Sequence, residues 1–556
     1  MPAAALQLDS RDNVIVALAT LEPGTTAEYG AGASCPVAQT IPAKQKMALT
    51  ALQPGELIVM YGMVVGEAMQ PIPRGGLLTT QNIRHRIGAY STTRQSEDGR
   101  LAAAHALPSA APWKNRTFMG YHRADGQVGT RNYWIVLPLV FCENRNVEQL
   151  REALEEELGY GRANSAYRQR VRNLIQTRSG DGAFSGRSLH EGWEASPSSG
   201  RVFPNLDGVR FITHQLGCGG TRQDAQALCG LLAGYIHHPN VAGATVLSLG
   251  CQNAQAALLM EELRARDPQM RKSVILVDQQ KSGTESALME RALEETFAAL
   301  EEANHAERAP APLSALTLGL QCGGSDGFSG ISANPTVGYA SDLVVGAGGK
   351  AVLSEFPELH GVEQELINRC VSDEAAERFA ALMQAYAARA RAVQSDFAFN
   401  PSPGNIRDGL ITDAIKSAGA ARKGGVSPVS DVIDYPEYVR KPGLTLQCTP
   451  GNDVESVTAQ VGAGCNLVLF TTGLGTPTGN PIAPVVKIST NSITGERMHD
   501  IIDFDAGSIV KGEATVAELG EKLLELAIQV AGGERRSCAE ERGQIDFIPW
   551  KRGVSL

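Results

Sequence analysis

The stretch ALTLGLQCGGSDGFSG, residues 315–330, joins a buried-strand pattern to an abrupt glycine-rich end. Its apolar run stops at Cys322, and two glycines, a serine and an aspartate follow. Glycine lets the backbone approach a ligand closely and turn its N–H groups toward an anion. In open α/β sheets, ligands bind beyond the carboxyl ends of the strands. The stretch therefore predicts an α/β sheet with a binding site where this strand ends.

The rest of the chain from residue 117 onward fits such a fold, because apolar strand patterns alternate with amphipathic helical patterns. The predicted strands are 133–141, 209–216, 244–249, 273–277, 315–320, 342–346 and 350–354. The polar stretch 176–201 shows neither the helical nor the strand periodicity of apolar residues, and we expect it to form a surface insert. Residues 1–93 differ, since short alternating runs separated by turns such as EPGTT indicate a β-rich unit.

We therefore expect an α/β protein with a small β-rich N-terminal domain and two Rossmann-like units whose sheets are mostly parallel. The expected boundaries are 1–93 for the β domain, 94–116 for a linker, 117–310 for the second domain and 311–556 for the C-terminal catalytic domain.

Four strand-like runs end at a cysteine: YWIVLPLVFC, VRFITHQLGC, ATVLSLGC and ALTLGLQC. If these strands share a sheet or face one cleft, the sulfurs of Cys142, Cys218, Cys251 and Cys322 converge. Soft thiolates suit iron, an iron–sulfur cluster or zinc. The alternative is that the four are small buried hydrophobic residues, as free cysteines usually are. The glycines beside Cys218, Cys251 and Cys322 favour the metal interpretation.

Three loops after or between strand patterns carry polar groups that could address hydroxyls or a carboxylate, although each alone is typical of an ordinary turn. They are NPSPGN with Asn400, Ser402 and Asn405, TPGND with Asn452, and TTGLGTPTGN with Thr471, Thr472 and Thr476.

Four further residues are candidates for catalysis. His214 could act as a base or a ligand, although a lone strand histidine is more often structural. Lys487 is a charge inside an apolar strand and needs an anionic partner, either a substrate or a structural carboxylate. Ser325 and Asp326 could act on a substrate or cap a turn. Glu355 and Glu358 come just after a predicted strand, as Ser325 and Asp326 do.

Composition narrows the function classes. The net charge of −10 argues against nucleic-acid binding, which needs a basic surface to replace counterions. The longest apolar runs are about half of a membrane span, and the first residues show no signal-peptide pattern. We therefore expect a cytoplasmic protein without membrane or nucleic-acid partners, and a homodimer as the default assembly.

Several segments resemble the altronate/galactarate dehydratase family. They include YHRADGQVGTRN, QCGGSDGFSGISANPTVGYASD, SEFPELHGVEQEL, NPSPGN, TPGND and FTTGLGTPTGNPIAPVVKI. The first 93 residues resemble the family's SAF-type β domain through DNVIVAL, IPAKQKMAL and YGMVVGEA, and the C-terminal FIPWKRGVSL is similar to the altronate branch. The resemblance spans nearly the whole chain.

The resemblance implies dehydration of a sugar acid, such as D-altronate, to a 2-keto-3-deoxy acid with iron or a similar divalent metal. Together with the four cysteines, it makes Fe²⁺ or a cysteine-ligated iron–sulfur cluster the expected cofactor, with another divalent metal such as Mn²⁺ as the alternative. Removing the proton beside a carboxylate needs stabilisation of an enolate-like dianion, and loss of hydroxide is helped by a Lewis acid. The chain departs from the family pattern where histidines are expected, with Asp9 and Gln45 in their places, and it has Leu474 and Gln252 where Arg and Glu are commoner.

These departures leave other functions open. Galactarate dehydration is one alternative within the family. A second is a sulfo-lyase that expels sulfite from a sulfolactate-like acid, and a third is a non-catalytic sugar-acid-binding relative.

Overall fold

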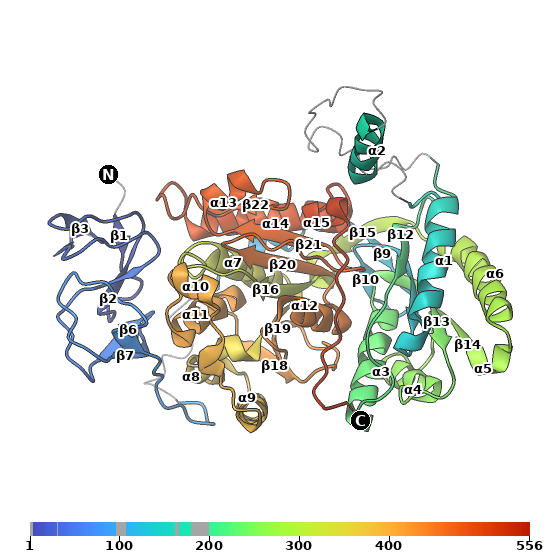
Figure 1. The fold of residues 1–556 in the computed structure, drawn as a ribbon, viewed down its shortest axis with the longest axis horizontal. Coiled ribbons are helices and arrows are strands. Elements are labelled where there is room, and N and C mark those ends of the chain that lie inside the picture. The colour runs from blue at the N-terminus through green and yellow to red at the C-terminus, as the bar shows by residue number, and fades with distance from the viewer. Residues whose placement is uncertain (1–3, 31, 96–106, 162–165, 179–199, 556) are drawn as a thin grey trace.

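The computed structural model describes residues 4–30, 32–95, 107–161, 166–178 and 200–555. Figure 1 shows a β-rich unit at the N-terminus, a central unit built from the C-terminal half, and a third unit formed by the middle of the chain. The α/β fold class predicted from the sequence is confirmed. The predicted insert at 176–201 lies mostly outside the described residues, and its start belongs to the helix α2, Ala166–Arg178.

The N-terminal unit consists of short antiparallel strands joined by tight turns. They form sheets in the orders β1-β2-β5, β3-β4 and β6-β7-β8. The strands are Ala5–Leu6 (β1), Val14–Ala17 (β2), Thr26–Glu28 (β3), Ser34–Pro36 (β4), Lys46–Ala48 (β5), Leu57–Met60 (β6), Met63–Ala68 (β7) and Ile83–Arg84 (β8).

The middle unit has a four-stranded parallel sheet in the order β12-β11-β13-β14. Its strands are Tyr133–Pro138 (β11), Gly208–Phe211 (β12), Val241–Ser248 (β13) and Ser273–Asp278 (β14). Besides α2, the helices of this unit are Asn144–Glu157 (α1), Arg222–His237 (α3), Ala256–Arg266 (α4), Gln279–Ser282 (α5) and Glu285–Ala303 (α6). A separate antiparallel sheet, β10-β9-β15, joins Thr117–His122 (β9), Val128–Gly129 (β10) and Arg308–Pro312 (β15).

The C-terminal unit is built on a seven-stranded parallel sheet in the order β18-β19-β17-β16-β20-β21-β22. Its strands are Thr317–Cys322 (β16), Lys350–Leu353 (β17), Val429–Ile433 (β18), Gly443–Gln447 (β19), Leu467–Thr472 (β20), Val485–Ser489 (β21) and Phe504–Asp505 (β22). Its helices are Ala333–Gly346 (α7), Glu363–Arg369 (α8), Asp373–Ala392 (α9), Pro403–Arg407 (α10), Asp413–Ala420 (α11), Asp453–Gly462 (α12), Ser492–Arg497 (α13), Val516–Gly532 (α14) and Cys538–Arg542 (α15).

The opening stretch therefore becomes the central strand of the largest sheet. All six residues of β16 are buried, and the strand ends at Cys322 as predicted. Parallel strands covered on both faces read as continuous apolar runs rather than alternating ones, which is why the sequence signal was clear.

One predicted strand is wrong. Residues 342–346 form the last turn and a half of the helix α7 rather than a strand. Ten residues of α7 are buried, including Leu343 and Val344, because the helix packs closely against α14 as well as near the sheet. A helix buried on several sides loses its amphipathic period, and its apolar run then resembles a buried strand.

The middle and C-terminal units meet where two helices cross without side chains between them. A Cβ atom on Gly234 of α3 would lie 2.0 Å from the carbonyl oxygen of Gly462, the last residue of α12. Only hydrogen at this position permits so close a backbone approach. The chain also crosses back at its end, since the backbone N–H groups of Arg552 and Gly553 both donate to Asp224 of α3 at 3.0 Å.

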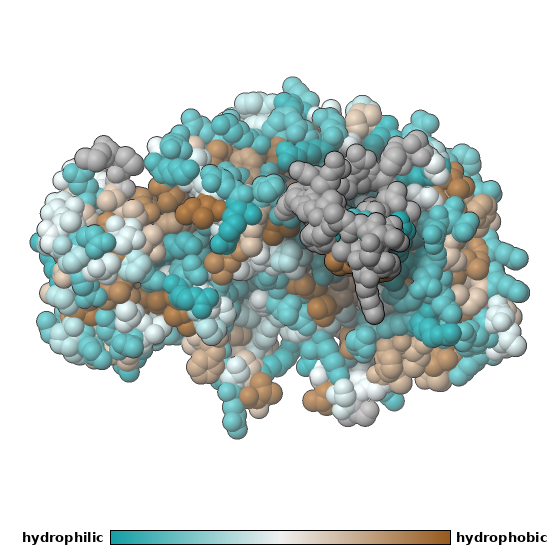
Figure 2. Space-filling view, turned by 45° about the horizontal axis from the view of Figure 1, so that its top comes forward, coloured by the Kyte–Doolittle hydropathy of each residue, from teal (hydrophilic) through white to brown (hydrophobic). Residues whose placement is uncertain are grey.

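The surface seen in Figure 2 carries hydrophilic and hydrophobic residues side by side, and the hydrophobic ones lie in separate groups. Within the described part of the chain, the structure contains no helix that is long and apolar enough to cross a membrane.

The helix crossing gives a first prediction. Gly234→Ala should lower the free energy of unfolding by about 1–3 kcal/mol, the usual cost of overpacking, because a backbone carbonyl cannot move aside as a side chain can. Urea unfolding followed by circular dichroism measures this. Gly88→Ala is the matched control, since a Cβ atom there meets nothing within 4 Å. Equal stability of the two variants would show that the crossing is not tight.

Candidate functional site

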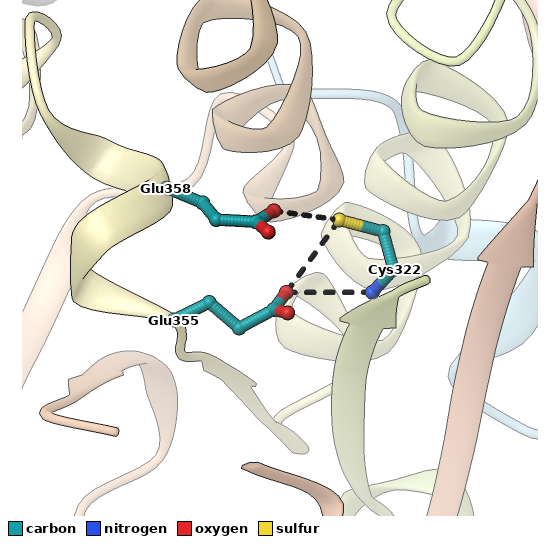
Figure 3. A group of neighbouring side chains, drawn as sticks. All are labelled: Cys322, Glu355 and Glu358. Atoms are coloured by element: carbon teal, nitrogen blue, oxygen red, sulfur yellow. Dashed lines mark hydrogen bonds between the residues drawn. The ribbon is translucent and has the colours of Figure 1, made fainter. Parts of the chain in front are cut away.

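The side chain of Cys322 lies at the carboxyl end of β16 and meets two carboxyl groups (Figure 3). Its Sγ atom donates a hydrogen bond to Glu358 at 3.1 Å and lies 3.5 Å from Glu355. The backbone N–H of Cys322 also points to Glu355, at 3.4 Å. All three side chains are at most 2% exposed. Burying two carboxyl groups beside a thiol requires compensation, because each charge loses its hydration.

Two lysines supply that compensation. Lys423 donates to Cys322 Sγ at 2.7 Å and to Glu355 at 2.6 Å. Lys416 pairs with Glu358 at 2.6 Å and donates to Asn400 Oδ1 at 2.8 Å. Lys423 follows α11 in the short helix η8, Ala421–Gly424, and Lys416 lies within α11. The cluster of Cys322, Glu355, Glu358, Lys416 and Lys423, called here the Cys322 cluster, is thus a charge-balanced network below the surface.

Burial and the neighbouring charges set the protonation of this cluster. Burial, with Glu355 and Glu358 nearby, raises the pKa of the Cys322 thiol well above its usual range. Burial and then Glu358 raise the pKa of Glu355, whereas Lys416 and Lys423 outweigh burial and lower the pKa of Glu358. Burial opposes the charge on Lys423, but the thiol and the two carboxyl groups raise its pKa. At neutral pH the two lysines are therefore cationic and Glu358 is ionised.

Glu355 is held in an unusual backbone conformation. Its φ of 64° lies in the left-handed region, which is costly for a residue with a side chain. The backbone N–H of Glu355 donates a hydrogen bond to the hydroxyl oxygen of Thr449 at 2.9 Å, and Gln321 donates to the Glu355 carboxyl group at 2.6 Å. A strained backbone conformation persists only where many surrounding contacts hold it in place. Here these contacts direct the Glu355 carboxyl group toward Cys322.

Asp453, the first residue of α12, connects the cluster with the surface. A Cβ atom on Gly323 would lie 2.1 Å from the Asp453 carboxylate, so the glycine after Cys322 makes room for it. Burial, together with Glu355 and Glu358, raises the pKa of Asp453 to about 7. A carboxyl group with this pKa can take up and release a proton at neutral pH.

The predicted NPSPGN loop reaches the same place through Asn400. The Nδ2 atom of Asn400 is buried and has no hydrogen-bond partner, and a Cβ atom on Gly451 would lie 3.5 Å from both this atom and Glu358. Ser402 and Asn405 instead form a capping box for α10, and Asn405 also donates to the Ser325 carbonyl at 2.8 Å. One of these three residues therefore offers a free donor, while the other two hold the loop in place.

The remaining substrate-binding candidates are divided in the same way. Thr476 and Thr472 lie against Gly324, 3.0 and 3.3 Å from a Cβ atom placed there. Thr471 donates to Asn334 at 2.6 Å inside the protein. Asn452 caps α12 by accepting from Val454 and Glu455.

Asp326 is tied to the N-terminal unit. Lys44 pairs with Asp326 and with Asp408, both at 3.0 Å. Gln45, at the position where a histidine was expected, donates to the Arg407 carbonyl at 2.9 Å. Lys46 donates to the Gly409 carbonyl at 2.6 Å, and burial lowers its pKa to about 7. The N-terminal unit thus contacts the loop that follows Cys322.

Asp9, at the other departure from the family pattern, bonds to Arg11 at the surface, and this bond lowers the pKa of Asp9 to about 2.

His214 and Lys487 have partners of their own outside the Cys322 cluster. Nε2 of His214 contacts the Pro138 carbonyl at 2.8 Å, Nδ1 accepts from the Leu216 N–H at 3.1 Å, and burial lowers the pKa of His214 to about 4. Lys487 donates to Gln544 at 2.6 Å, and burial lowers its pKa to about 8. Both sets of contacts are those of residues that hold neighbouring segments together.

The four cysteines predicted to share a metal lie on two different sheets. Cys322 ends a strand of the seven-stranded sheet, whereas Cys142, Cys218 and Cys251 follow strands of the four-stranded sheet and are exposed. Among the described residues, the group of three Cys, His, Asp or Glu ligand atoms within 4.8 Å of one another is Cys322, Glu355 and Glu358.

The Cys322 cluster has donors that could hold a metal ion, but its charges are already balanced. The ammonium group of Lys423 lies 2.7 Å from the Cys322 Sγ atom and 2.6 Å from the Glu355 carboxyl group. The ammonium group of Lys416 forms an ion pair with Glu358. A divalent ion at these atoms would have to displace at least one lysine. The cluster as it stands therefore fits two ammonium groups better than a metal.

The two lysines and Asp453 were missed by the sequence interpretation. Lys423 stands among small residues in the segment AGAARKGG, whereas Lys487 drew attention as a charge inside an apolar strand. What the sequence does not show is that this segment, 101 residues after Cys322, packs against the end of its strand.

Comparisons with known proteins match all three units. The altronate/galactarate dehydratase SAF domain matches residues 3–86. The second domain of D-galactarate dehydratase/altronate hydrolase matches 120–304. The C-terminal domain of D-galactarate/altronate dehydratase matches 313–555.

Full-length relatives agree. The altronate dehydratase of Escherichia coli (strain K12) is 32% identical over 551 residues, 99% of each chain. The galactarate dehydratase (L-threo-forming) of the same organism is 30% identical over 508 residues, 90% of this chain and 88% of its own. The (2R)-sulfolactate sulfo-lyase subunit beta of Chromohalobacter salexigens is 30% identical over 438 residues, 78% of this chain and 97% of its own.

The site and these matches define an enzyme of the hydro-lyase class. The chain belongs to the D-galactarate/altronate dehydratase family.

The buried ion pairs give a second prediction. Lys423→Met should lower the free energy of unfolding by about 3–5 kcal/mol, because it leaves Glu355 buried without its cation. Lys441→Met is the control: Lys441 pairs with Asp431 at 2.9 Å but is 63% exposed, so its loss should cost less than about 1 kcal/mol. Denaturant unfolding measures both, and an unchanged midpoint for Lys423→Met would contradict the assigned charge balance.

Proposed function

We propose that this enzyme dehydrates an aldonate, with D-altronate as the substrate, to a 2-keto-3-deoxy acid. The observation that carries the proposal is Asp453, a carboxyl group with a pKa of about 7 that lies against Gly323, beside the buried Cys322 cluster. The end-to-end match to an altronate dehydratase supports the choice of substrate.

The proposed reaction begins at the carbon beside the substrate carboxylate. Asp453 takes the proton from this carbon, and the electron pair of the broken C–H bond moves toward the carboxylate. Lys416 stays protonated because Glu358 raises its pKa against the effect of burial, so its cation stabilises the developing dianion. The unpartnered Nδ2 of Asn400 would donate to the same carboxylate.

Loss of hydroxide completes the elimination. The electron pair forms a carbon–carbon double bond as the neighbouring C–O bond breaks, and the resulting enol becomes the 2-keto product. In this proposal Lys423, Glu355 and Cys322 do not touch the substrate. They hold Glu358 and Lys416 in place, and Glu355 also helps burial to raise the pKa of Asp453, so we class them as positioning residues. Of the earlier catalytic candidates, Ser325 and Asp326 remain beside the site, and the proposal makes no use of His214 or Lys487.

Iron remains the proposed metal, with manganese as the alternative, but no step above passes through it. Since the Cys322 cluster is already neutralised, we place the iron with the cysteines of the middle unit. The homodimer and the cytoplasmic location stay predictions.

A second candidate function is a sulfo-lyase, favoured by the similarity to the sulfolactate sulfo-lyase subunit. The same dianion would then expel sulfite in place of hydroxide. That relative covers 78% of this chain, whereas the altronate dehydratase covers 99% and therefore also spans the N-terminal β unit. The end-to-end match to a single-chain relative keeps dehydration as the first proposal.

A substrate comparison tests the proposal. The full chain, kept under anaerobic conditions with ferrous iron, should form a 2-keto acid fastest with D-altronate, more slowly or not at all with galactarate, and release no sulfite from (2R)-sulfolactate. Chromatography of the keto acid and titration of sulfite measure the products. Sulfite as the main product would establish the second candidate, and binding without any product would identify a non-catalytic relative.

A pH profile tests the role of Asp453. If its carboxylate is the base, kcat/KM should rise about tenfold per pH unit up to about pH 7 and then level off, because the proton must leave before the group can act. Asp453→Asn should lower kcat/KM by about 10²–10⁴-fold and remove the inflection. Glu455→Gln, two residues further along α12, should keep both the rate and the profile. A retained inflection in Asp453→Asn would assign the base elsewhere.

A further inference from the structure

The middle unit holds three cysteines at corresponding places on neighbouring strands. Cys142 lies just after β11 in the short helix η3, Phe141–Glu143, Cys218 follows β12, and Cys251 follows β13. These strands are adjacent and parallel, in the order β12-β11-β13. The three thiols therefore stand at the same edge of one sheet, where α/β proteins bind their ligands.

Backbone contacts bring the three cysteine loops together. The N–H of Phe141 donates to the Leu216 carbonyl at 3.1 Å, and the N–H of Asn253 donates to the Gly217 carbonyl at 2.9 Å. A Cβ atom on Gly217 would lie 2.2 Å from the Leu139 carbonyl, so this loop rests directly on the one before Cys142. Each cysteine is within two residues of one of these contacts.

His214 and Asn144 strengthen the same junction. His214 spans from the end of β11 at Pro138 to Leu216 in the Cys218 loop. Asn144, two residues after Cys142, donates to the His214 carbonyl at 2.8 Å. The buried histidine, which lies in the loop after β12, thus holds two of the cysteine loops together.

Exposure sets these thiols apart. Cys142, Cys218 and Cys251 are exposed, whereas the other seven cysteines are buried or half-buried. An unpaired thiol usually packs as a small hydrophobic residue. Core packing therefore does not account for three exposed cysteines on adjoining loops.

We propose that Cys142, Cys218 and Cys251 bind an iron–sulfur cluster. Thiolates are the ligands that iron–sulfur clusters take. A single tetrahedral ion with metal–sulfur bonds near 2.3 Å would draw the sulfurs to about 3.8 Å from one another. The three sulfurs are not a group within 4.8 Å among the described residues. A cluster of several irons, unlike a single ion, is bound by thiolates that lie further apart than this.

A pocket beside Cys218 fits this assignment. It has a volume of about 270 Å³ and is lined by Gly219, Gly220, Thr221, Asn253 and Lys551 among others. Three protein thiolates leave one iron of a four-iron cluster without a protein ligand, and the pocket has room for a small oxygen ligand there. The ammonium group of Lys551 and the glycine N–H groups favour the negative charge of such a cluster.

The test measures iron and sulfide in the full chain after anaerobic reconstitution with ferrous iron and sulfide, followed by desalting. We expect about four irons and four sulfides per chain, with a matching electron paramagnetic resonance signal after reduction. Cys142→Ser, Cys218→Ser and Cys251→Ser should each lose most of the iron. Before reconstitution, their far-ultraviolet circular dichroism and melting should match those of the unsubstituted chain, because the three side chains are exposed.

Two controls complete the test. Cys538→Ser, half-buried and distant in sequence from the three loops, should keep its iron, and so should Cys322→Ser because Cys322 belongs to the other sheet. Iron bound without sulfide, iron retained in Cys218→Ser, or equal loss in Cys322→Ser would each overturn the proposal. No substrate enters the measurement, so its outcome is separate from that of the proposed dehydration.

Discussion

The structure around β16 depends on one constraint: two carboxyl groups and a thiol buried together need two cations. Lys423 and Lys416 supply them from a single helical segment, α11 and η8, in which most of the other residues are small. Small side chains let this segment approach the sheet closely enough for ammonium groups to reach the end of β16. The strained backbone of Glu355, the glycine at 323 and the raised pKa of Asp453 all follow from fitting these charges into one place.

The same constraint involves the N-terminal unit. Its Lys44 neutralises Asp326, four residues beyond Cys322, and its Lys46 is buried against the backbone of the 407–409 turn. Gln45 lies between them and reaches the same turn through an amide. An imidazole at that position would stand beside a lysine pair, so a neutral amide avoids a further positive charge. The exchange therefore changes the electrostatics of the contact while keeping a hydrogen bond.

The sequence was sufficient for the fold class, since buried parallel strands such as 133–138 and 317–322 carry a largely apolar run. It failed at 342–346, where a helix covered on several sides shows the same run. Local patterns also located Cys322, Asn400 and the three cysteines of the other sheet at strand ends or loops. They could not show which cysteines belong together, because strand order is a long-range property. Lys416 and Lys423 were missed for the same reason.

Residues 551–553 of the C-terminal unit help to build the pocket of the middle unit. Arg552 and Gly553 bind Asp224, and Lys551 lines the pocket beside Cys218, although these residues come more than 300 positions after that cysteine. The pocket beside Cys218 therefore has its full lining only when the C-terminal unit has folded and residues 551–553 have packed against α3.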